Sequence, residues 1–234
     1  MVSYLQGHHS MNENDENDIK KKPWPTKDAM EQIYKKNLWG GDNADFYSGT
    51  GSHDPEIVDA YVQAVRSFLS SFEDPIVVCD MGCGDFNVGS RLVQHAKKYV
   101  AVDIVEGLIE RNRQKYRADN LEFRCLDIAA DVWPEGDCVI LRQVLQHLSN
   151  AEILRIVEKL YEFRFVILTE HLPEGDFIPN KDIISGQGIR LNKESGVDLT
   201  APPFSFKIAG EEEWLRTSSK EGKGVLVTTL FKIR

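Results

Sequence analysis

The residues with the clearest chemical potential follow a short apolar run, in the segment Val78-Cys-Asp-Met-Gly-Cys-Gly-Asp-Phe-Asn87. Gly82 and Gly84 lie in the turn after this run, and glycines there let the backbone approach a ligand closely. A dinucleotide fingerprint GxGxxG would need a third glycine at the position of Asn87. Asp80 has no role in that fingerprint, but its carboxylate could accept a hydrogen bond from an ammonium group or orient the amides of the turn. The turn therefore fits a cofactor with an amino-acid moiety better than one bound through a pyrophosphate.

Two further carboxylates end the next two apolar runs. Asp103 follows the second run, where a carboxylate can accept hydrogen bonds from both hydroxyls of a ribose. Asp127 follows the third run and is placed to accept from an adenine amino group, while Ile128 packs on the ring. Each acid alone would also serve as the cap of a surface turn. Together with Gly82 and Gly84 they favour a cofactor that contains a nucleoside.

The elements that must position these residues alternate along the chain. Apolar runs predict five strands, over residues 76–80, 99–104, 121–126, 138–142 and 163–170. Amphipathic stretches between them predict helices over residues 87–96, 105–117 and 149–161, the last with a capping box of Ser149 and Glu152. Strands that are apolar on both faces and separated by helices form a parallel sheet covered on both sides. Residues 212–217 and 225–233 add a C-terminal antiparallel hairpin. The predicted fold is α/β, a doubly wound, seven-stranded, mostly parallel sheet.

The chain divides into three parts. Residues 1–22 are too polar to bury a core and are predicted to be a disordered tail. Residues 23–53 are predicted to form a helix and a small-residue lid, with Thr26 capping a helix that runs to about Leu38. The main domain then covers residues 54–234.

Two predictions concern the first helix and the long loop of that main domain. Asp54-Pro55 opens its first helix, because proline suits the first helical position. Residues 171–205 are rich in glycine, proline, asparagine and aspartate, and they form a loop too long for a simple connection. We expect this loop to face the substrate. Candidate substrate-binding side chains are Tyr47 in the lid and Asn180 and Arg190 in the loop. For Asn180 and Arg190 the alternative is a solvated loop.

From its strand-end motifs, the chain resembles the class I S-adenosylmethionine-dependent methyltransferases over residues ~54 to 234. Asp80-Met-Gly-Cys-Gly84 is similar to their motif I, Asp103 to their ribose-binding acid and Asp127-Ile128 to their adenine-side motif. The usual third glycine of motif I is Phe86 in this chain. The resemblance implies a Rossmann-like methyltransferase fold, a transferase and S-adenosylmethionine as the cofactor. The cofactor-binding residues it implies are Asp80, Gly82, Cys83, Gly84, Asp103, Ile104, Asp127, Ile128, Arg142 and Gln143.

A narrower likeness lies in Ser48-Gly-Thr-Gly-Ser52, Cys83-Gly-Asp-Phe-Asn87 and Leu141-Arg-Gln-Val-Leu-Gln-His-Leu-Ser149. These segments are similar to those of a group of small bacterial methyltransferases with a CGDFN motif, some of which are associated with saccharide or natural-product pathways. The likeness implies a small-molecule acceptor that is methylated at oxygen or nitrogen.

Methyl transfer is an in-line displacement, so the protein must hold the nucleophile and the methyl carbon close together and away from water. A base is needed only when the acceptor must lose a proton. His147, in an apolar turn, is a candidate base, although a packing histidine is the favoured reading there, and His171 at the end of the fifth run is a second candidate. Arg142 and Gln143 leave the fourth run, where they could contact cofactor or substrate; a salt bridge from Arg142 to Asp80 is an equal alternative.

Composition limits the partners of the chain. It has 28 Lys and Arg against 37 Asp and Glu, a net charge of −9, which disfavours binding to a nucleic acid. We expect no membrane segment, a cytoplasmic location and no metal site, with Cys79, Cys83, Cys125 and Cys138 as reduced core thiols. A homodimer is compatible with this sequence.

Three alternative functions stay open at this stage. One is a nicotinamide-dependent oxidoreductase, which Asp80 and the absence of a glycine at position 87 disfavour. Another is a non-catalytic module that binds S-adenosylmethionine or a protein partner. The third is methylation of a protein or RNA acceptor, which the negative charge disfavours.

Overall fold

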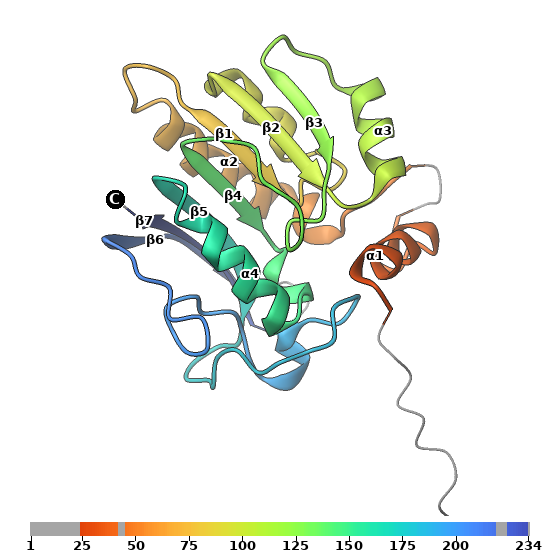
Figure 1. Cartoon of the computed structure of the whole chain (residues 1–234), viewed down its shortest axis with the longest axis vertical. Helices are drawn as coiled ribbons and strands as arrows, with labels where there is room; N and C mark the ends of the chain where they lie inside the picture. The colour runs from red at the N-terminus through yellow and green to blue at the C-terminus, as the bar shows by residue number, and fades with distance from the viewer. Residues whose placement is uncertain (1–23, 42–44, 219–223, 234) are drawn as a thin grey trace, which may run out of the picture.

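The computed structural model describes residues 24–41, 45–218 and 224–233, and the predicted tail lies outside these ranges. Seven strands form a single sheet in the order β3-β2-β1-β4-β5-β7-β6 (Figure 1). Strands β1 to β5 run parallel, whereas β7 is antiparallel to both β5 and β6. The predicted fold class is therefore confirmed. The strand bounds are Val77–Met81 (β1), Lys98–Asp103 (β2), Leu121–Cys125 (β3), Cys138–Arg142 (β4), Phe165–Leu172 (β5), Gly210–Ser218 (β6) and Val225–Lys232 (β7).

Helices α2 and α4 lie on opposite faces of this sheet (Figure 1). Helix α2 (Pro55–Leu69) begins as predicted, because the Asp54 side chain accepts a hydrogen bond from the amide of Glu56. Helix α4 (Asn150–Leu160) begins with the predicted capping box. Helix α3 (Glu106–Lys115) connects β2 to β3.

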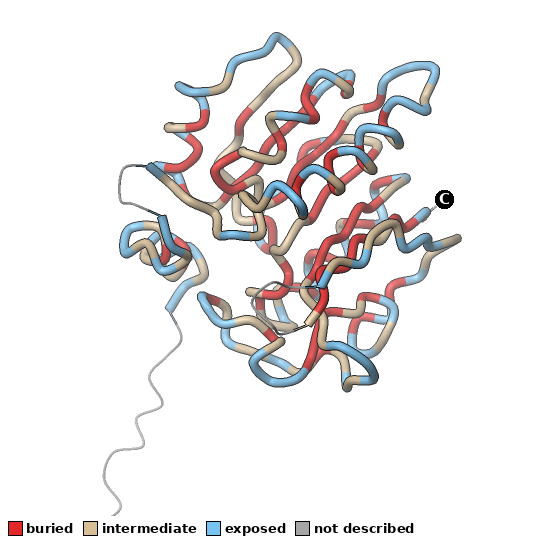
Figure 2. The backbone as a smooth tube through the Cα atoms, turned by 180° about the vertical axis from the view of Figure 1, so that it is seen from behind, coloured by how far each residue is buried: buried red, intermediate tan, exposed pale blue. Residues whose placement is uncertain are grey.

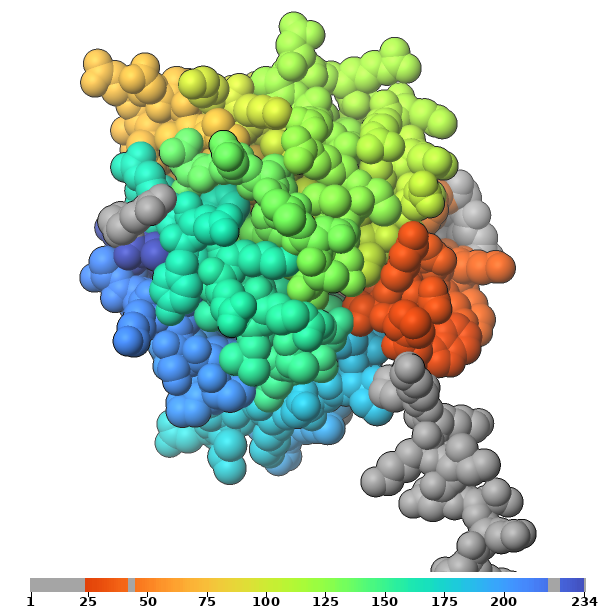
Figure 3. Space-filling model, viewed as in Figure 1, coloured from red at the N-terminus to blue at the C-terminus, as the bar shows by residue number. Residues whose placement is uncertain are grey.

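The N-terminal helix α1 (Thr26–Lys35) differs from its prediction at both ends. Pro25 occupies the N-cap position, and the Thr26 hydroxyl donates instead to the carboxylate of Glu152 on α4. The helix ends before Leu38, because Asn37 adopts a left-handed conformation with φ of 49°. The predicted cap and end are therefore wrong. In the space-filling view, α1 sits on the body of the protein beside the light-blue loop that follows β5 (Figure 3).

The predicted helix over residues 87–96 is also wrong. The chain there forms two short 3-10 turns, Gly89–Arg91 and Val93–His95. Phe86 precedes them with φ of +62°, and its ring is fully buried against Tyr99 and Phe123. Burial of this ring and the poor helix propensity of glycine and valine favour a compact turn over a helix.

Each face of the sheet has its own apolar core (Figure 2). One core joins α1 and α4 to the sheet, and the other joins α2 to the opposite face. Cys79 on β1 lies beside Val139 on β4, so Cys138, one residue earlier, points to the other face. Cys79 therefore packs in the first core and Cys138 in the second. All four cysteines are free thiols.

Candidate functional site

A cavity of about 580 Å³ opens at the carboxyl ends of the parallel strands. This volume lies within the range of small-molecule binding sites, and strand ends are where open α/β sheets bind their ligands. All ten residues predicted to bind the cofactor line the cavity. So do His147 and His171, whereas Tyr47, Asn180 and Arg190 do not.

The turn after β1 needs its glycines. Gly82 and Gly84 have φ of +86° and +55°, a region that side chains other than glycine rarely adopt. A Cβ at Gly82 would lie 2.4 Å from Val144 Cγ2, and one at Gly84 would lie 2.4 Å from Ser48 Oγ. The amides of Gly82 and Cys83 both donate to the carbonyl of Val102 on β2. The turn is thus held against β2 with its open side toward the cavity.

Asp103 fixes the shape of that turn from the end of β2. Its Oδ2 accepts from the amide of Gly84 at 3.1 Å and its Oδ1 from the amide of Val105 at 3.1 Å. Burial raises the pKa of this carboxyl. Each oxygen of a carboxylate has two acceptor sites, so Asp103, which lines the cavity, can accept further hydrogen bonds from hydroxyl groups there.

Asp127 and Ile128 lie in the loop after β3. The half-buried carboxylate of Asp127 accepts from the amide of Ala129 at 2.8 Å. Ile128 is buried and contributes an apolar wall beside Ile104 and Leu126. This part of the cavity thus combines the Asp127 carboxylate with an aliphatic wall.

Asp80 and Arg142 lie near each other at the inner end of the cavity. Asp80 is buried and accepts from the Tyr99 hydroxyl at 2.9 Å. Burial raises the pKa of Asp80 to about 7, although the Tyr99 hydrogen bond and Arg142 oppose this shift. The Arg142 guanidinium donates to the carbonyl of Gly51 at 2.6 Å and lies 4.9 Å over the ring of Tyr61.

The expected alternative for Arg142, a salt bridge to Asp80, is absent from the described part of the chain. Among the described residues, Arg142 Nε and the Tyr61 hydroxyl are buried polar atoms with no hydrogen-bond partner. Buried polar groups are normally paired, so these two atoms indicate a polar ligand at this end.

His147 is held on both sides of its ring. Its Nδ1 lies 3.1 Å from the carbonyl of Gly186, which can only accept, and its Nε2 lies 3.3 Å from Nε2 of Gln146. The Trp39 ring packs against it at 5.2 Å. Burial lowers the pKa of His147 to about 4, which leaves it neutral and a weak base near pH 7. This geometry favours the packing role.

His171 lies at the carboxyl end of β5, half-buried, and lines the cavity. Its amide donates to Oε1 of Gln146 at 3.2 Å. The neighbouring residue Glu170 is not among the residues that line the cavity; it is 2 % exposed and accepts from the amide of Leu145 at 3.0 Å. Burial raises the pKa of Glu170 to about 8.

Glu170→Gln should change how stability depends on pH. The folded protein holds the Glu170 proton more tightly than the unfolded chain does, so ionisation costs stability as the pH rises from about 5 toward 8. Glutamine can still accept from Leu145 and cannot ionise. We expect the free energy of unfolding of the variant, relative to wild type, to rise by on the order of 3 kcal/mol over this interval. Urea denaturation at three pH values measures it, and a constant difference would contradict the expectation.

Tyr47 lies outside the main cavity. Its ring stacks on His53 at 4.4 Å and lines a separate hollow of about 200 Å³ together with Arg111 and Tyr116. The expectation that Tyr47 contacts substrate is therefore corrected. The ring packs here because residues 45–53 fold back on the turn after β1, where Ser48 and Asp85 are hydrogen-bonded.

Asn180 and Arg190 are corrected in the same way. Asn180 is buried, and its side chain donates to the carbonyl of Asp198 at 2.7 Å and accepts from its amide at 2.9 Å. Arg190 is fully buried and donates to the carbonyl of Leu145 and to Oδ1 of Asn150. Asn180 pairs polar backbone groups inside the long loop, whereas Arg190 ties the loop to the turn after β4 and to the start of α4.

Several lining residues were missed from the sequence. Tyr61 on α2 and Tyr99 on β2 were given no role in the site, yet both line the cavity. Their hydroxyls on otherwise apolar elements were the available signal. Gln146 and Trp39 also line the cavity, and no spacing marked them.

Across the described ranges, no cluster of His, Cys, Asp and Glu could hold a metal ion. No helix in the same ranges has the length and apolar character to cross a membrane.

A comparison with known protein families matches the part of the chain that contains many of the cavity residues. A family model described as a methyltransferase domain matches residues 78–163, from β1 to the end of α4. A search of curated protein sequences found no match to the chain.

Solved structures with the same fold share little sequence. The N-methyltransferase NodS from Bradyrhizobium japonicum WM9, in complex with S-adenosylhomocysteine, aligns with a TM-score of 0.62 at 12% identity, over 88% of this chain and 100% of NodS. Magnesium protoporphyrin IX methyltransferase from Synechocystis PCC 6803, with bound S-adenosylmethionine, aligns with a TM-score of 0.55 at 18% identity, over 89% and 98%. The N-terminal domain of EvdMO1, in the presence of S-adenosylhomocysteine and D-fucose, aligns with a TM-score of 0.58 at 14% identity, over 88% and 97%.

These comparisons agree with the fold and the domain type that were predicted from the sequence. The solved structures share the predicted fold. The family-model match over residues 78–163 confirms the prediction of a methyltransferase domain. Two of the solved structures hold S-adenosylhomocysteine or S-adenosylmethionine, in agreement with the predicted cofactor.

Proposed function

We propose that the chain transfers a methyl group from S-adenosylmethionine to an oxygen or nitrogen of an uncharged small-molecule acceptor, a saccharide or a natural-product intermediate. The observation that carries this proposal is the pair of opposite charges at the inner end of the cavity. Asp80 and Arg142 are close to each other but not paired, and both line the cavity.

This pair fits the zwitterionic end of the cofactor. Asp80 can accept from an ammonium group, and Arg142, whose Nε has no partner among the described residues, can donate to a carboxylate. A pyrophosphate offers no ammonium for Asp80, so the pair also disfavours the oxidoreductase alternative. Asp103 would then hold the ribose hydroxyls, and Asp127 with Ile128 the adenine.

We assign to the acceptor the part of the cavity where most of the polar side chains are uncharged, although Glu152 also lines the cavity. Gln143, Gln187 and Asn192 line it together with Trp39 and the imidazole of His171. Amide groups offer both donors and acceptors, and an aromatic ring offers a flat apolar surface, which suits hydroxyl-bearing rings. The D-fucose present with EvdMO1 supports a saccharide, and the N-methyltransferase NodS supports nitrogen as a second acceptor atom.

S-adenosylmethionine supplies an electrophilic methyl group on a positively charged sulfur. The chain's own task is to position the acceptor and exclude water. Where the acceptor is a hydroxyl, we assign the base to His171, which lines the cavity from the end of β5. His147 is the weaker candidate, because its pKa lies near 4.

The division into an N-terminal lid (23–53) and a main domain (54–234) is part of this proposal, as is a cytoplasmic enzyme without a nucleic-acid partner. Residues 48–52 and several residues of the main domain line one cavity, which supports a lid. A homodimer stays a prediction.

Incubation with labelled S-adenosylmethionine and a library of small acceptors tests the proposal. We expect label in neutral hydroxylated or amine-bearing acceptors and no binding of NADH in calorimetry. Tight S-adenosylhomocysteine binding without turnover of any acceptor would support the non-catalytic alternative, and label in protein or RNA would support the macromolecular one.

A further inference from the structure

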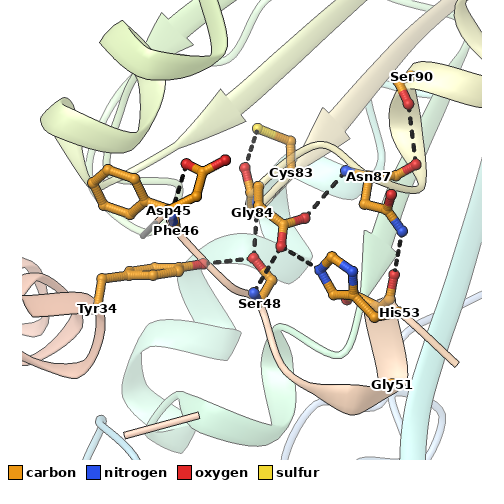
Figure 4. Close-up of polar contacts among 12 residues, drawn as sticks. Tyr34, Asp45, Phe46, Ser48, Gly51, His53, Cys83, Gly84, Asn87 and Ser90 are labelled. Atoms are coloured by element: carbon orange, nitrogen blue, oxygen red, sulfur yellow. Dashed lines mark hydrogen bonds and ion pairs between the residues drawn. The ribbon is translucent and has the colours of Figure 1, made fainter. Parts of the chain in front are cut away.

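Residues 45–53, here called the clasp segment, cross the turn after β1 and are tied to it by Asp85. This carboxylate is 3 % exposed. Its Oδ2 accepts from the amide of Ser48 at 2.8 Å and from Nε2 of His53 at 2.6 Å. The amide of Asp85 donates in return to Oγ of Ser48 at 2.8 Å. Ser48 lies near the middle of the segment and His53 at its end, and Figure 4 shows both beside the turn that contains Gly84.

Further contacts support the same arrangement. The side chain of Asn87 donates to the carbonyl of Ser52 at 2.7 Å, and the hydroxyl of Tyr34 lies 3.0 Å from Oγ of Ser48 (Figure 4). Between the two anchored residues the segment contains Gly49, with φ of +85°, and Gly51. The segment is thus held at Ser48 and at Ser52 and His53, with Gly49 and Gly51 between these points.

The clasp segment covers the part of the cavity that we assign to the cofactor. Residues 48–52 and the Gly82–Gly84 turn line the same cavity. Gly51 accepts from Arg142, and a Cβ at Gly51 would lie 2.5 Å from Nε2 of Gln143. Residues 48–52 therefore form a wall of the space beside the turn.

We propose that Asp85 is the latch of the clasp segment and that its hydrogen bonds to Ser48 and His53 control exchange of the cofactor. Opening would break both bonds at once and expose a buried carboxylate to water. Asp85 is a positioning residue, since it acts through the segment. This inference rests on the proposed function, because the exchanged molecule is S-adenosylmethionine or its product.

Binding kinetics of S-adenosylhomocysteine to the immobilised protein test the latch. Asp85→Asn weakens both bonds, and His53→Phe removes one donor while retaining the stacking on Tyr47. We expect each variant to raise the dissociation rate by about tenfold, the effect of losing one charge-assisted hydrogen bond, and also to raise the association rate. Asp59→Asn, in an exposed ion pair with Arg91 on the surface of α2, is the matched control and should leave both rates unchanged.

The two rates separate a latch from a structural role. A residue that only shapes the pocket would raise the dissociation rate without raising the association rate, and that result would overturn the proposal, as would unchanged rates. Faster amide hydrogen exchange confined to residues 45–53 in Asp85→Asn, with slower exchange restored in Asp85→Glu, is the second expected readout. Failure of the wild type to bind S-adenosylhomocysteine would overturn the proposed function together with the latch, whereas normal wild-type binding with unaltered variants would overturn the latch alone.

Discussion

Asp103→Ala should lower the affinity for S-adenosylhomocysteine by at least about 100-fold, the loss expected when two hydrogen bonds to a carboxylate disappear. The carboxylate lies at the end of β2 and is buried at the cavity wall. The substitution also removes the acceptor for the amides of Gly84 and Val105, so the turn loses its support. Isothermal titration calorimetry measures the affinity, and unaltered binding would contradict the site assignment.

Two comparisons separate ligand contact from loss of fold. Asp119→Ala, at an exposed position before β3, is the control and should bind normally. An S-adenosylhomocysteine analogue without the 2′-hydroxyl should bind more weakly than the parent compound to wild type. In Asp103→Ala the two ligands should bind equally, because the partner of that hydroxyl is gone. A persistent difference would show that another residue holds the ribose.

The strands and the cofactor side of the site were predictable because two independent patterns agree there. Apolar runs long enough for buried strands end in acids or glycines, and the ends of parallel strands meet at one edge. Asp80, Asp103 and Asp127 therefore came together as expected. The positions of these acids follow from the strand order alone and do not depend on side-chain contacts.

The acceptor side was less predictable, because its residues lie in loops without periodicity. Asn180 and Arg190 have the residue types of ligand-binding groups, yet Asn180 pairs with the backbone of the loop and Arg190 with Leu145 and Asn150 outside it. The choice between these roles depends on which carbonyl groups the folded loop buries. The turn at Phe86 was missed for a similar reason, since burial of one ring among three aromatic neighbours outweighed the helical spacing.

Binding of S-adenosylhomocysteine should weaken by close to tenfold for each pH unit below 7, through the ionisation of Asp80. Burial raises the pKa of this carboxyl to about 7, with Tyr99 and Arg142 opposing the shift and Asp103 adding to it. An ammonium group pairs with the ionised form of Asp80, whereas below pH 7 this carboxyl is mostly protonated in the free protein. Binding below pH 7 must therefore release the proton of Asp80. Between pH 7 and 5 the expected loss of affinity is on the order of 100-fold.

Calorimetry at pH 6 in buffers with different ionisation enthalpies should detect about one proton released for each ligand bound. Asp80→Asn should bind more weakly at pH 7 and show no release, because asparagine does not titrate. The ligand supplies a second control: 5′-methylthioadenosine lacks both the amino and the carboxylate group, so its affinity should not vary with pH in this range. If its affinity followed the same slope, the titrating group would act on the nucleoside end. If wild-type affinity for S-adenosylhomocysteine were flat from pH 5 to 7, Asp80 would not be the partner of the ammonium group.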